Sequence, residues 1–235
     1  MRGSLPHPTA MLVLLSLSLL GAPHAAVAQA EFSTYLGFFH PTGRLGSYEV
    51  EPGLGGTSSL EIENHDAAAL GARLTLWMGS TFGFEGTVTY AQSEVAILTT
   101  FESSDLPQIF IRSRMELDAV LLSATGRVQA RLALSEASWL RLAGGLGIFE
   151  RAGDAFELYD DASGVTFVVG TGVTTRVTPG LAIRFDLEDY ISSPDLTPAG
   201  SQRTREGFET PPPPDIGTDT QHDIVLSAGI SLALW

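Results

Sequence analysis

The sequence contains no cysteine and no lysine, so all 13 basic residues are arginine. Without cysteine the chain has no disulfide framework, no thiolate nucleophile and no cysteine-ligated metal site. The 27 acidic residues give a formal net charge of −14, which argues against binding to the phosphate backbone of a nucleic acid. Charged residues make up only 17% of the chain, below the roughly 25% of a typical soluble domain. The length of 235 residues suits one domain or one closed barrel.

Long apolar runs are also missing. No stretch reaches the roughly 20 apolar residues that a membrane-spanning helix needs. The apolar run at residues 10–20 follows Arg2 and precedes Ala-x-Ala patterns within residues 22–30. This order is typical of a cleaved secretory signal peptide rather than a membrane anchor.

We therefore expect residues 1–28 to be a cleaved signal peptide and residues 29–235 to form one exported domain. Cleavage follows Ala28 or, as the alternative, Ala30. An exported chain with so little charge is either a soluble extracytoplasmic domain or a membrane β-barrel.

Apolar and polar residues alternate along most of the mature chain. In residues 70–76, leucine or alanine occupies every second position, and Gly71, Arg73 and Thr75 lie between them. Alternation with a period of two predicts half-buried β-strands. Eight such runs are present, at residues 31–41, 67–77, 81–92, 114–128, 138–150, 164–177, 181–191 and 222–235. The fourth run changes phase within residues 116–122, which suggests a β-bulge.

The connections between these runs alternate in length. Short or moderate connections lie at 78–80, 129–137 and 178–180, and longer polar stretches lie at 42–66, 93–113, 151–163 and 192–221. Outer-membrane barrels have short periplasmic turns and long outer loops. The pattern therefore predicts an all-β fold, an eight-stranded antiparallel up-and-down transmembrane β-barrel with both termini in the periplasm.

Charged residues occupy the inward phase of several predicted strands. An eight-stranded barrel has a lumen just wide enough for side chains to fill, and unpaired buried charges are costly. We therefore expect a packed polar network rather than a conducting pore. Its members are Arg73, Glu85, Arg141, Arg176, Arg184, Asp186 and Glu188.

Several glycine-rich and terminal segments carry a family resemblance. They are residues 139–147 (WLRLAGGLG), 168–173 (VVGTGV), 178–181 (TPGL) and the closing stretch 224–235. With these segments the chain resembles the small outer-membrane β-barrel proteins of Gram-negative bacteria, of the outer-membrane-protein-A transmembrane-domain and OmpW-like kind. The resemblance implies insertion by the barrel-assembly machinery. It also implies contact with outer-membrane lipid and lipopolysaccharide, and a monomeric state.

Three tryptophans, Trp77, Trp139 and Trp235, lie at the predicted periplasmic strand ends but on the lumen phase. Tryptophan is enriched in aromatic belts at the two membrane–water interfaces. These three residues are expected either in such a belt or as a cap on the barrel floor, and the sequence leaves both open.

Two groups of residues could carry chemistry. His222 and Asp223 form a candidate catalytic dyad of a barrel-type lipid A hydrolase, but Ile224 stands where the resemblance would require a serine. We therefore expect no catalysis. Carboxylates that could hold a divalent cation occur at Asp154, Glu157, Asp160 and Asp161, without the spacing of a known calcium loop. We expect an ordinary solvated loop, with no metal and no cofactor.

The function expected from these observations is a structural or surface-interaction role in the outer membrane. Three alternatives stay open: a narrow conduit for small apolar molecules, the lipid A hydrolase, and a soluble lipocalin-like carrier. The conduit requires an apolar lumen or a lateral gap. The carrier requires apolar residues on the inward phase.

Overall fold

The computed structural model describes residues 29–50, 56–103, 110–157, 162–193, 217–218 and 220–234. The expected signal peptide lies outside these residues. No helix in the described part of the chain is long and apolar enough to cross a membrane.

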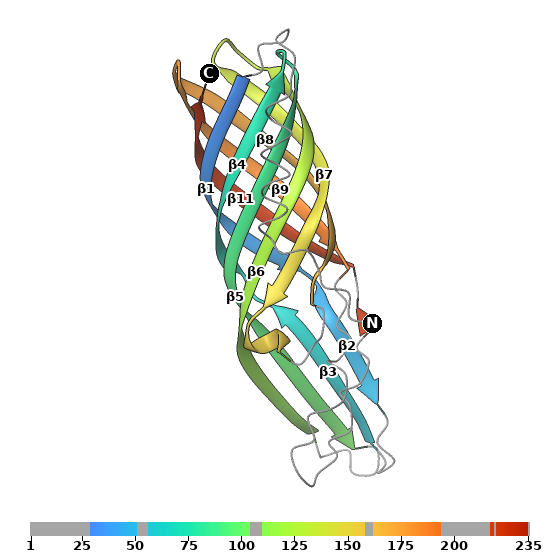
Figure 1. Ribbon diagram of the computed structural model, residues 1–235. Coiled ribbons are helices and arrows are strands. Elements are labelled where there is room, and N and C mark those ends of the chain that lie inside the picture. Colours follow the sequence, from blue (N-terminus) through green and yellow to red (C-terminus); the bar gives the residue numbers. More distant parts are fainter. Residues whose placement is uncertain are drawn as a thin grey trace, which may run out of the picture.

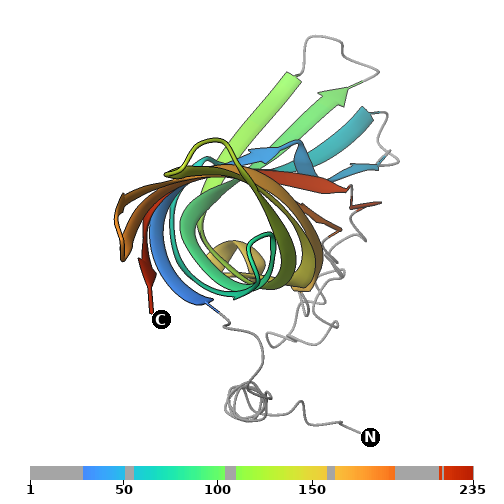
Figure 2. The ribbon, with the colours of Figure 1, turned by 90° about the horizontal axis from the view of Figure 1, so that it is seen from above.

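Eight antiparallel strands form a closed ring (Figures 1 and 2). In order around the ring they are β4 (Ala67–Met78), β1 (Gln29–Thr42), β11 (Gln221–Ala233), β9 (Leu181–Ser192), β8 (Gly164–Thr178), β7 (Ser138–Ala152), β6 (Phe110–Ala133) and β5 (Phe82–Ser103). The ring closes because β5 pairs with β4 on one side and with β6 on the other. The predicted eight-stranded antiparallel barrel is confirmed.

The two ends of the barrel differ in their connections. At one end, short segments at 79–81, 134–137 and 179–180 join successive strands, and β1 begins and β11 ends there. We call this the turn end; it is the upper end in Figure 1. We call the opposite end the loop end.

The strands present an apolar outer face and a largely polar inner face. Along β1, Phe32, Leu36 and Phe38 are exposed, whereas Ser33 and Tyr35 between them are buried. The same alternation runs around the wall, and Leu36 is 73% exposed. Apolar side chains that face outward from a closed sheet are typical of a barrel surrounded by lipid hydrocarbon.

The outer apolar surface ends near the loop end in a row of histidine–aspartate pairs. His40 on β1 lies 2.6 Å from Asp66, and His222 on the neighbouring β11 lies 2.9 Å from Asp189 (Nδ1 to Oδ). Both histidines are about half exposed on the outer face. On these strands the two pairs replace the apolar side chains that face outward nearer the turn end.

Strands β5 and β6 continue past the ring and carry an outgrowth of the same sheet, which we call the loop-end extension. It is completed by β2 (Arg44–Val50), β3 (Gly56–Asn64) and β10 (Gly217–Thr218). Strand β3 pairs with the far half of β5, and β2 pairs with β3. Figure 2 shows these strands leaving the ring to one side.

The extension corrects the expectation of polar loops at 42–66 and 93–113. The first stretch contains β2 and β3, and most of the second belongs to β5 and β6. An apolar core stabilises them. It buries Leu45, Ile62, Val95, Ala119 and, from the 3₁₀ helix η1 (Asp154–Phe156), Ala155 and Phe156, together with Ala162.

The phase change in residues 116–122 is not a bulge, so that prediction is wrong. Strand β6 pairs with β5 without interruption from Phe110 to Ala130. What changes is the polarity of the inner face, which carries Leu117, Ala119 and Leu121 towards the loop end and then Ser123. Among the described strands, β6 pairs with β5 alone from Phe110 to Ala119, since its pairing with β7 begins at Val120.

Candidate functional site

A group of seven buried charges fills the lumen in the half nearer the turn end. We call it the charged cluster: Arg73, Glu85, Arg127, Arg141, Arg184, Asp186 and Glu188. Each is at most 5% exposed. Four arginines face three carboxylates, so the cluster carries one excess positive charge. Burial of this kind is tolerated only when the charges pair and hydrogen-bond.

Glu85 on β5 is the hub of this cluster. Arg184 donates hydrogen bonds to both carboxylate oxygens, from Nη1 to Oε2 at 2.5 Å and from Nη2 to Oε1 at 3.2 Å. Arg141 donates from Nη2 to Oε2 at 3.2 Å. Thr75 and Gln129 donate to the same oxygen at 2.8 and 3.2 Å. Strands β5 and β9 lie four steps apart in the ring of eight, so the Glu85–Arg184 pair spans the lumen.

Glu188 forms a second centre one layer towards the loop end. Arg73 donates to its Oε1 at 2.9 Å, and Arg127 donates to both of its oxygens. Tyr190 donates to Oε2 at 3.0 Å and accepts from Arg127 at 2.8 Å. Asp186 links the two centres, because Arg73 and Arg184 reach its Oδ2 at 3.0 and 2.6 Å. Side chains from five strands, β4, β5, β6, β7 and β9, are cross-linked in this way across the lumen.

Tyr35 supports Arg73 from the wall. The guanidinium carbon of Arg73 lies 3.8 Å from the centre of the Tyr35 ring, a cation–π contact. The ring has room because Gly71 and Gly229 stand on both sides of it in the pairing register. A Cβ at Gly71 would overlap the Tyr35 ring, and one at Gly229 would lie 2.9 Å from the Tyr35 Cβ.

Towards the loop end, the lumen becomes apolar. Phe39 and Phe149 lie 6.4 Å apart between ring centres, and Ala91, Leu121 and Val225 pack beside them. The cavity left among these side chains is about 10 Å³, close to the minimum that holds one water molecule. This apolar half is therefore packed, not open.

A buried ion pair closes the apolar half. Arg151 on β7 and Asp223 on β11 are both buried, with Nη2 and Oδ2 3.4 Å apart. Ser192 accepts a further hydrogen bond from Arg151 at 3.2 Å. Beyond this pair lies the apolar core of the loop-end extension.

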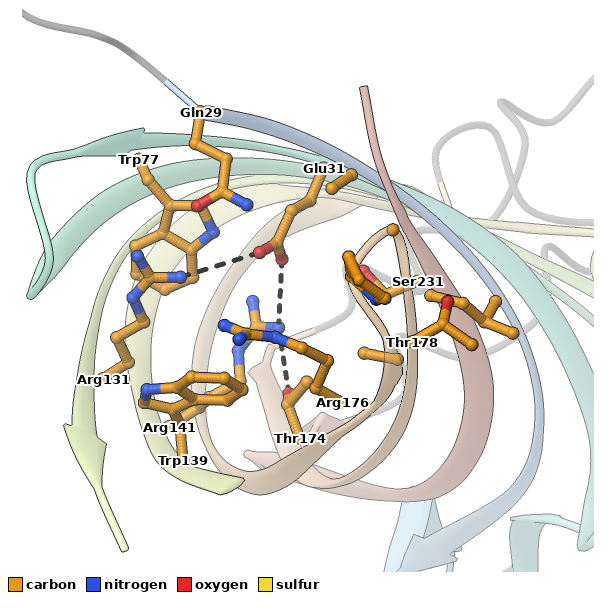
Figure 3. Close-up of a pocket in the computed structure, with 15 residues that line it drawn as sticks. Gln29, Glu31, Trp77, Arg131, Trp139, Arg141, Thr174, Arg176, Thr178 and Ser231 are labelled. Carbon is orange, nitrogen blue, oxygen red and sulfur yellow. Dashed lines mark hydrogen bonds and ion pairs between the residues drawn. The ribbon is translucent and has the colours of Figure 1, made fainter. Parts of the chain in front are cut away.

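At the turn end, the lumen opens into a pocket of about 60 Å³, which we call the turn-end pocket (Figure 3). Arg131, Arg141 and Arg176 line it together with one carboxylate, Glu31. Glu31 reaches between Arg131 and Arg141, at 3.6 and 3.9 Å from their Nη1 atoms (Figure 3). These distances allow ionic attraction but are too long for hydrogen bonds.

The sequence of this barrel matches a known protein family. The family model described as "Outer membrane protein beta-barrel domain" matches residues 12–229, most of the chain. The chain belongs to this family. No significant match was found among curated proteins.

Two solved structures share the fold of this outer-membrane barrel. The outer membrane protein OprG from Pseudomonas aeruginosa is 10% identical, with a TM-score of 0.52 over 89% of this chain and 97% of that one. The outer membrane protein AlkL, determined in lipid bilayers, is 12% identical, with a TM-score of 0.53 over 100% of this chain and 97% of that one. Identities this low establish the fold alone.

Six of the seven residues named from the sequence for the lumen lie in the charged cluster of this outer-membrane barrel. Arg176 does not. It is exposed at the turn end, where its guanidinium carbon lies 4.7 Å from the centre of the Trp139 ring. The bulge in β8 between Arg176 and Thr178 displaces this part of the strand from the regular register.

Sequence reasoning missed Arg127, which belongs to the charged cluster. It also missed Tyr190, which hydrogen-bonds to Arg127 and Glu188. Tyr190 shares the inward phase of Arg184, Asp186 and Glu188 on β9, so the same periodicity could have identified it. Arg127 was obscured by the polarity change in β6. Counted back from Gln129, it falls on the inward phase.

Trp77 and Trp139 line the turn-end pocket instead of facing lipid. Trp77 is 1% exposed, and Arg131 stacks on it at 4.1 Å. For these two residues, the structure favours the floor of the barrel over the aromatic belt. Trp235 lies outside the described residues.

The candidate dyad of His222 and Asp223 does not form, because consecutive strand residues point to opposite faces. His222 pairs with Asp189 on the outer face, and Asp223 pairs with Arg151 inside. Of the four carboxylates named as possible metal ligands, Asp154 and Glu157 are exposed, and Asp160 and Asp161 lie outside the described residues. Within the described ranges, no group of three or more potential ligands could hold a metal ion.

Proposed function

We propose that this outer-membrane protein is a non-conducting, non-catalytic barrel that presents the loop-end extension at the cell surface. The charged cluster is the observation that carries the proposal. It lies between the turn-end pocket and the small apolar cavity, so neither reaches the other end of the lumen. A structural or surface-interaction role is consistent with a closed lumen and an extended outer sheet.

The orientation is part of the proposal. Bacterial outer-membrane barrels have short periplasmic turns and longer outer segments, so we place the turn end in the periplasm and the loop end outside. Residues 1–28 then act as the export signal. Outer-membrane lipid and lipopolysaccharide surround the apolar outer face, and the barrel-assembly machinery inserts the chain. Because the ring closes on itself, we expect a monomer.

Conductance in planar lipid bilayers tests the closed lumen. The purified wild-type protein is expected to give no steady unit conductance. The double variant Glu85→Ser/Arg184→Ser removes the pair that spans the lumen and is expected to produce measurable current. Arg114→Ser, at an exposed ion pair on the extension, serves as the control and should stay silent. Steady conductance by the wild-type protein would contradict the proposal.

Protease accessibility on intact cells tests the orientation. A protease site inserted after Ser103, the last residue of β5, should be cut by protease added outside the cells. The same site inserted at Gly79, in the turn between β4 and β5, should be cut only after the outer membrane is permeabilised. The reverse result would invert the proposed orientation.

Handling of small apolar molecules is a second candidate, favoured by the apolar half of the lumen around Phe39, Leu121 and Phe149. Because the present cavity is about 10 Å³, such a ligand would have to displace side chains. Entry of an apolar fluorescent dye into cells with and without the protein tests this. Dye entry that is the same with and without the protein would contradict this second candidate. Dye entry that requires the protein and is abolished by Ala91→Phe would support it.

A further inference from the structure

The turn-end pocket combines positive charge with available hydrogen-bond donors. Three guanidinium groups line the pocket around the single carboxylate of Glu31. Glu31 forms ion pairs with Arg131 and Arg141 only, and neither pair is short enough to be a hydrogen bond. This excess is notable in a chain whose formal net charge is −14. Electrostatically, the pocket favours a negatively charged ligand.

Arg131 and Arg176 each have N–H groups that are not used in hydrogen bonds to the described residues. Among the described residues, the Arg176 side chain has no hydrogen bond and no ion pair, and its guanidinium stacks on Trp139. Arg131 uses its Nε to donate to the Ser80 carbonyl at 2.8 Å, and its terminal nitrogens have only the long ion pair with Glu31. Arg131 and Arg176 also repel each other, and a shared anion would relieve this repulsion.

The pocket is preorganised for recognition. Trp77 and Trp139 hold Arg131 and Arg176 by stacking at 4.1 and 4.7 Å, so little side-chain freedom remains to be lost on binding. The indole N–H of Trp77 is a further buried donor, and no described residue accepts a hydrogen bond from it. Figure 3 shows both indole rings beside the three arginines.

Size narrows the class of ligand. The pocket has a volume of about 60 Å³. At roughly 15 Å³ for each water, this volume holds about four water molecules. That is enough for one phosphate-sized group, but not for a sugar or a nucleotide. Guanidinium groups match the oxygens of phosphate bidentately.

From these observations we propose that the turn-end pocket binds a single phosphate group through Arg131, Arg141 and Arg176. The group is either free inorganic phosphate or the headgroup phosphate of a phospholipid at the adjacent membrane surface. Glu31 occupies part of the site when the phosphate is absent. The proposal does not depend on the orientation of the barrel or on a closed lumen.

Tryptophan fluorescence of the full-length protein in neutral detergent tests this binding, because Trp77 and Trp139 line the pocket. The protein is titrated with inorganic phosphate and, separately, with short-chain phosphatidylglycerol, with phosphate-free diacylglycerol of the same chain length as the blank. Saturable binding of phosphate supports the free-ion source. Binding of the phospholipid alone supports the headgroup source.

Three variants separate specific binding from general charge effects. Arg176→Gln should weaken binding by roughly tenfold or more, the effect of losing one hydrogen bond to a charged group. Glu31→Gln should tighten binding, since it removes the competing carboxylate. Arg114→Gln, at the far end of the molecule, should leave it unchanged. The proposal is overturned if neither compound binds, or if binding is the same in Arg176→Gln as in the wild type.

Discussion

Arg184 and Glu85 face each other across the barrel, 99 positions apart in the sequence, and are joined by two hydrogen bonds. Their side chains are 2% and 0% exposed, respectively. The pair therefore links opposite walls directly, in a fold whose other long-range contacts run mostly between neighbouring strands.

Breaking this pair on one side should destabilise the barrel. Glu85→Gln leaves Arg184 and Arg141 without their shared carboxylate, and we expect a loss of about 3–5 kcal/mol in the free energy of unfolding. Urea titration in lipid vesicles measures it. Arg184→Gln should cost a similar amount, and the double variant should cost less than the sum of the two. Additive losses would show that the two residues are not coupled.

Gly71 should not tolerate alanine. The added Cβ would overlap the Tyr35 ring and crowd the Val88 carbonyl oxygen, so we expect a destabilisation of about 1–3 kcal/mol. The heat-induced shift in gel mobility should then occur at a lower temperature. Gly86→Ala is the matched control on the adjacent strand, because nothing lies within 4 Å of its added Cβ. Tyr35→Ala should restore part of the loss, and equal effects at both glycines would contradict the close packing.

A charge on the outer face should report which surface contacts hydrocarbon. Leu36→Arg places a guanidinium at the middle of β1 and should cost about 2–4 kcal/mol in vesicles. Ile111→Arg makes the same change at a side chain that is 59% exposed on the extension, and it should cost little. Equal costs would mean that the extension also lies in the bilayer.

Phe156 should stabilise the loop-end extension but not the barrel. Because it is 5% exposed within the second apolar core, Phe156→Ala should cost about 3–5 kcal/mol of local stability. Amide hydrogen exchange should accelerate in β2 and β3 while the ring strands keep their protection. Phe110→Ala, at an exposed phenylalanine, should leave both regions unchanged. Faster exchange throughout the ring in Phe156→Ala would show that the two regions unfold together.

Alternation along the chain was sufficient to predict the ring. Every predicted run corresponds to a ring strand, because lipid outside and a polar lumen inside impose a strict period of two. The extension was missed because the polar residues Ser93 and Glu94 resembled the start of a loop, although the β-branched residues that follow continue the strand. There β5 has an apolar core on one face and water on the other, so the polarity of its two faces no longer follows the barrel pattern.

The charged cluster could be predicted as a set of residues but not as a set of pairs. Phase along a strand shows which side chains point inward. Which of them meet depends on the order of strands around the ring and on their stagger. Arg73 reaches Glu188 on β9, and Arg176 at the turn end reaches no carboxylate among the described residues. Neither outcome can be read from one strand alone.

Beyond the ring, one side of β6 pairs with no strand that the structure describes, and this has a consequence for self-association. An exposed strand edge is a template on which another copy can add a strand. Along this edge Arg112, Arg114, Glu116 and Asp118 occupy alternate positions, and all four are exposed. Charges on an edge strand oppose such pairing. These four residues therefore act against aggregation, and neutralising them would favour edge-to-edge polymers of folded barrels.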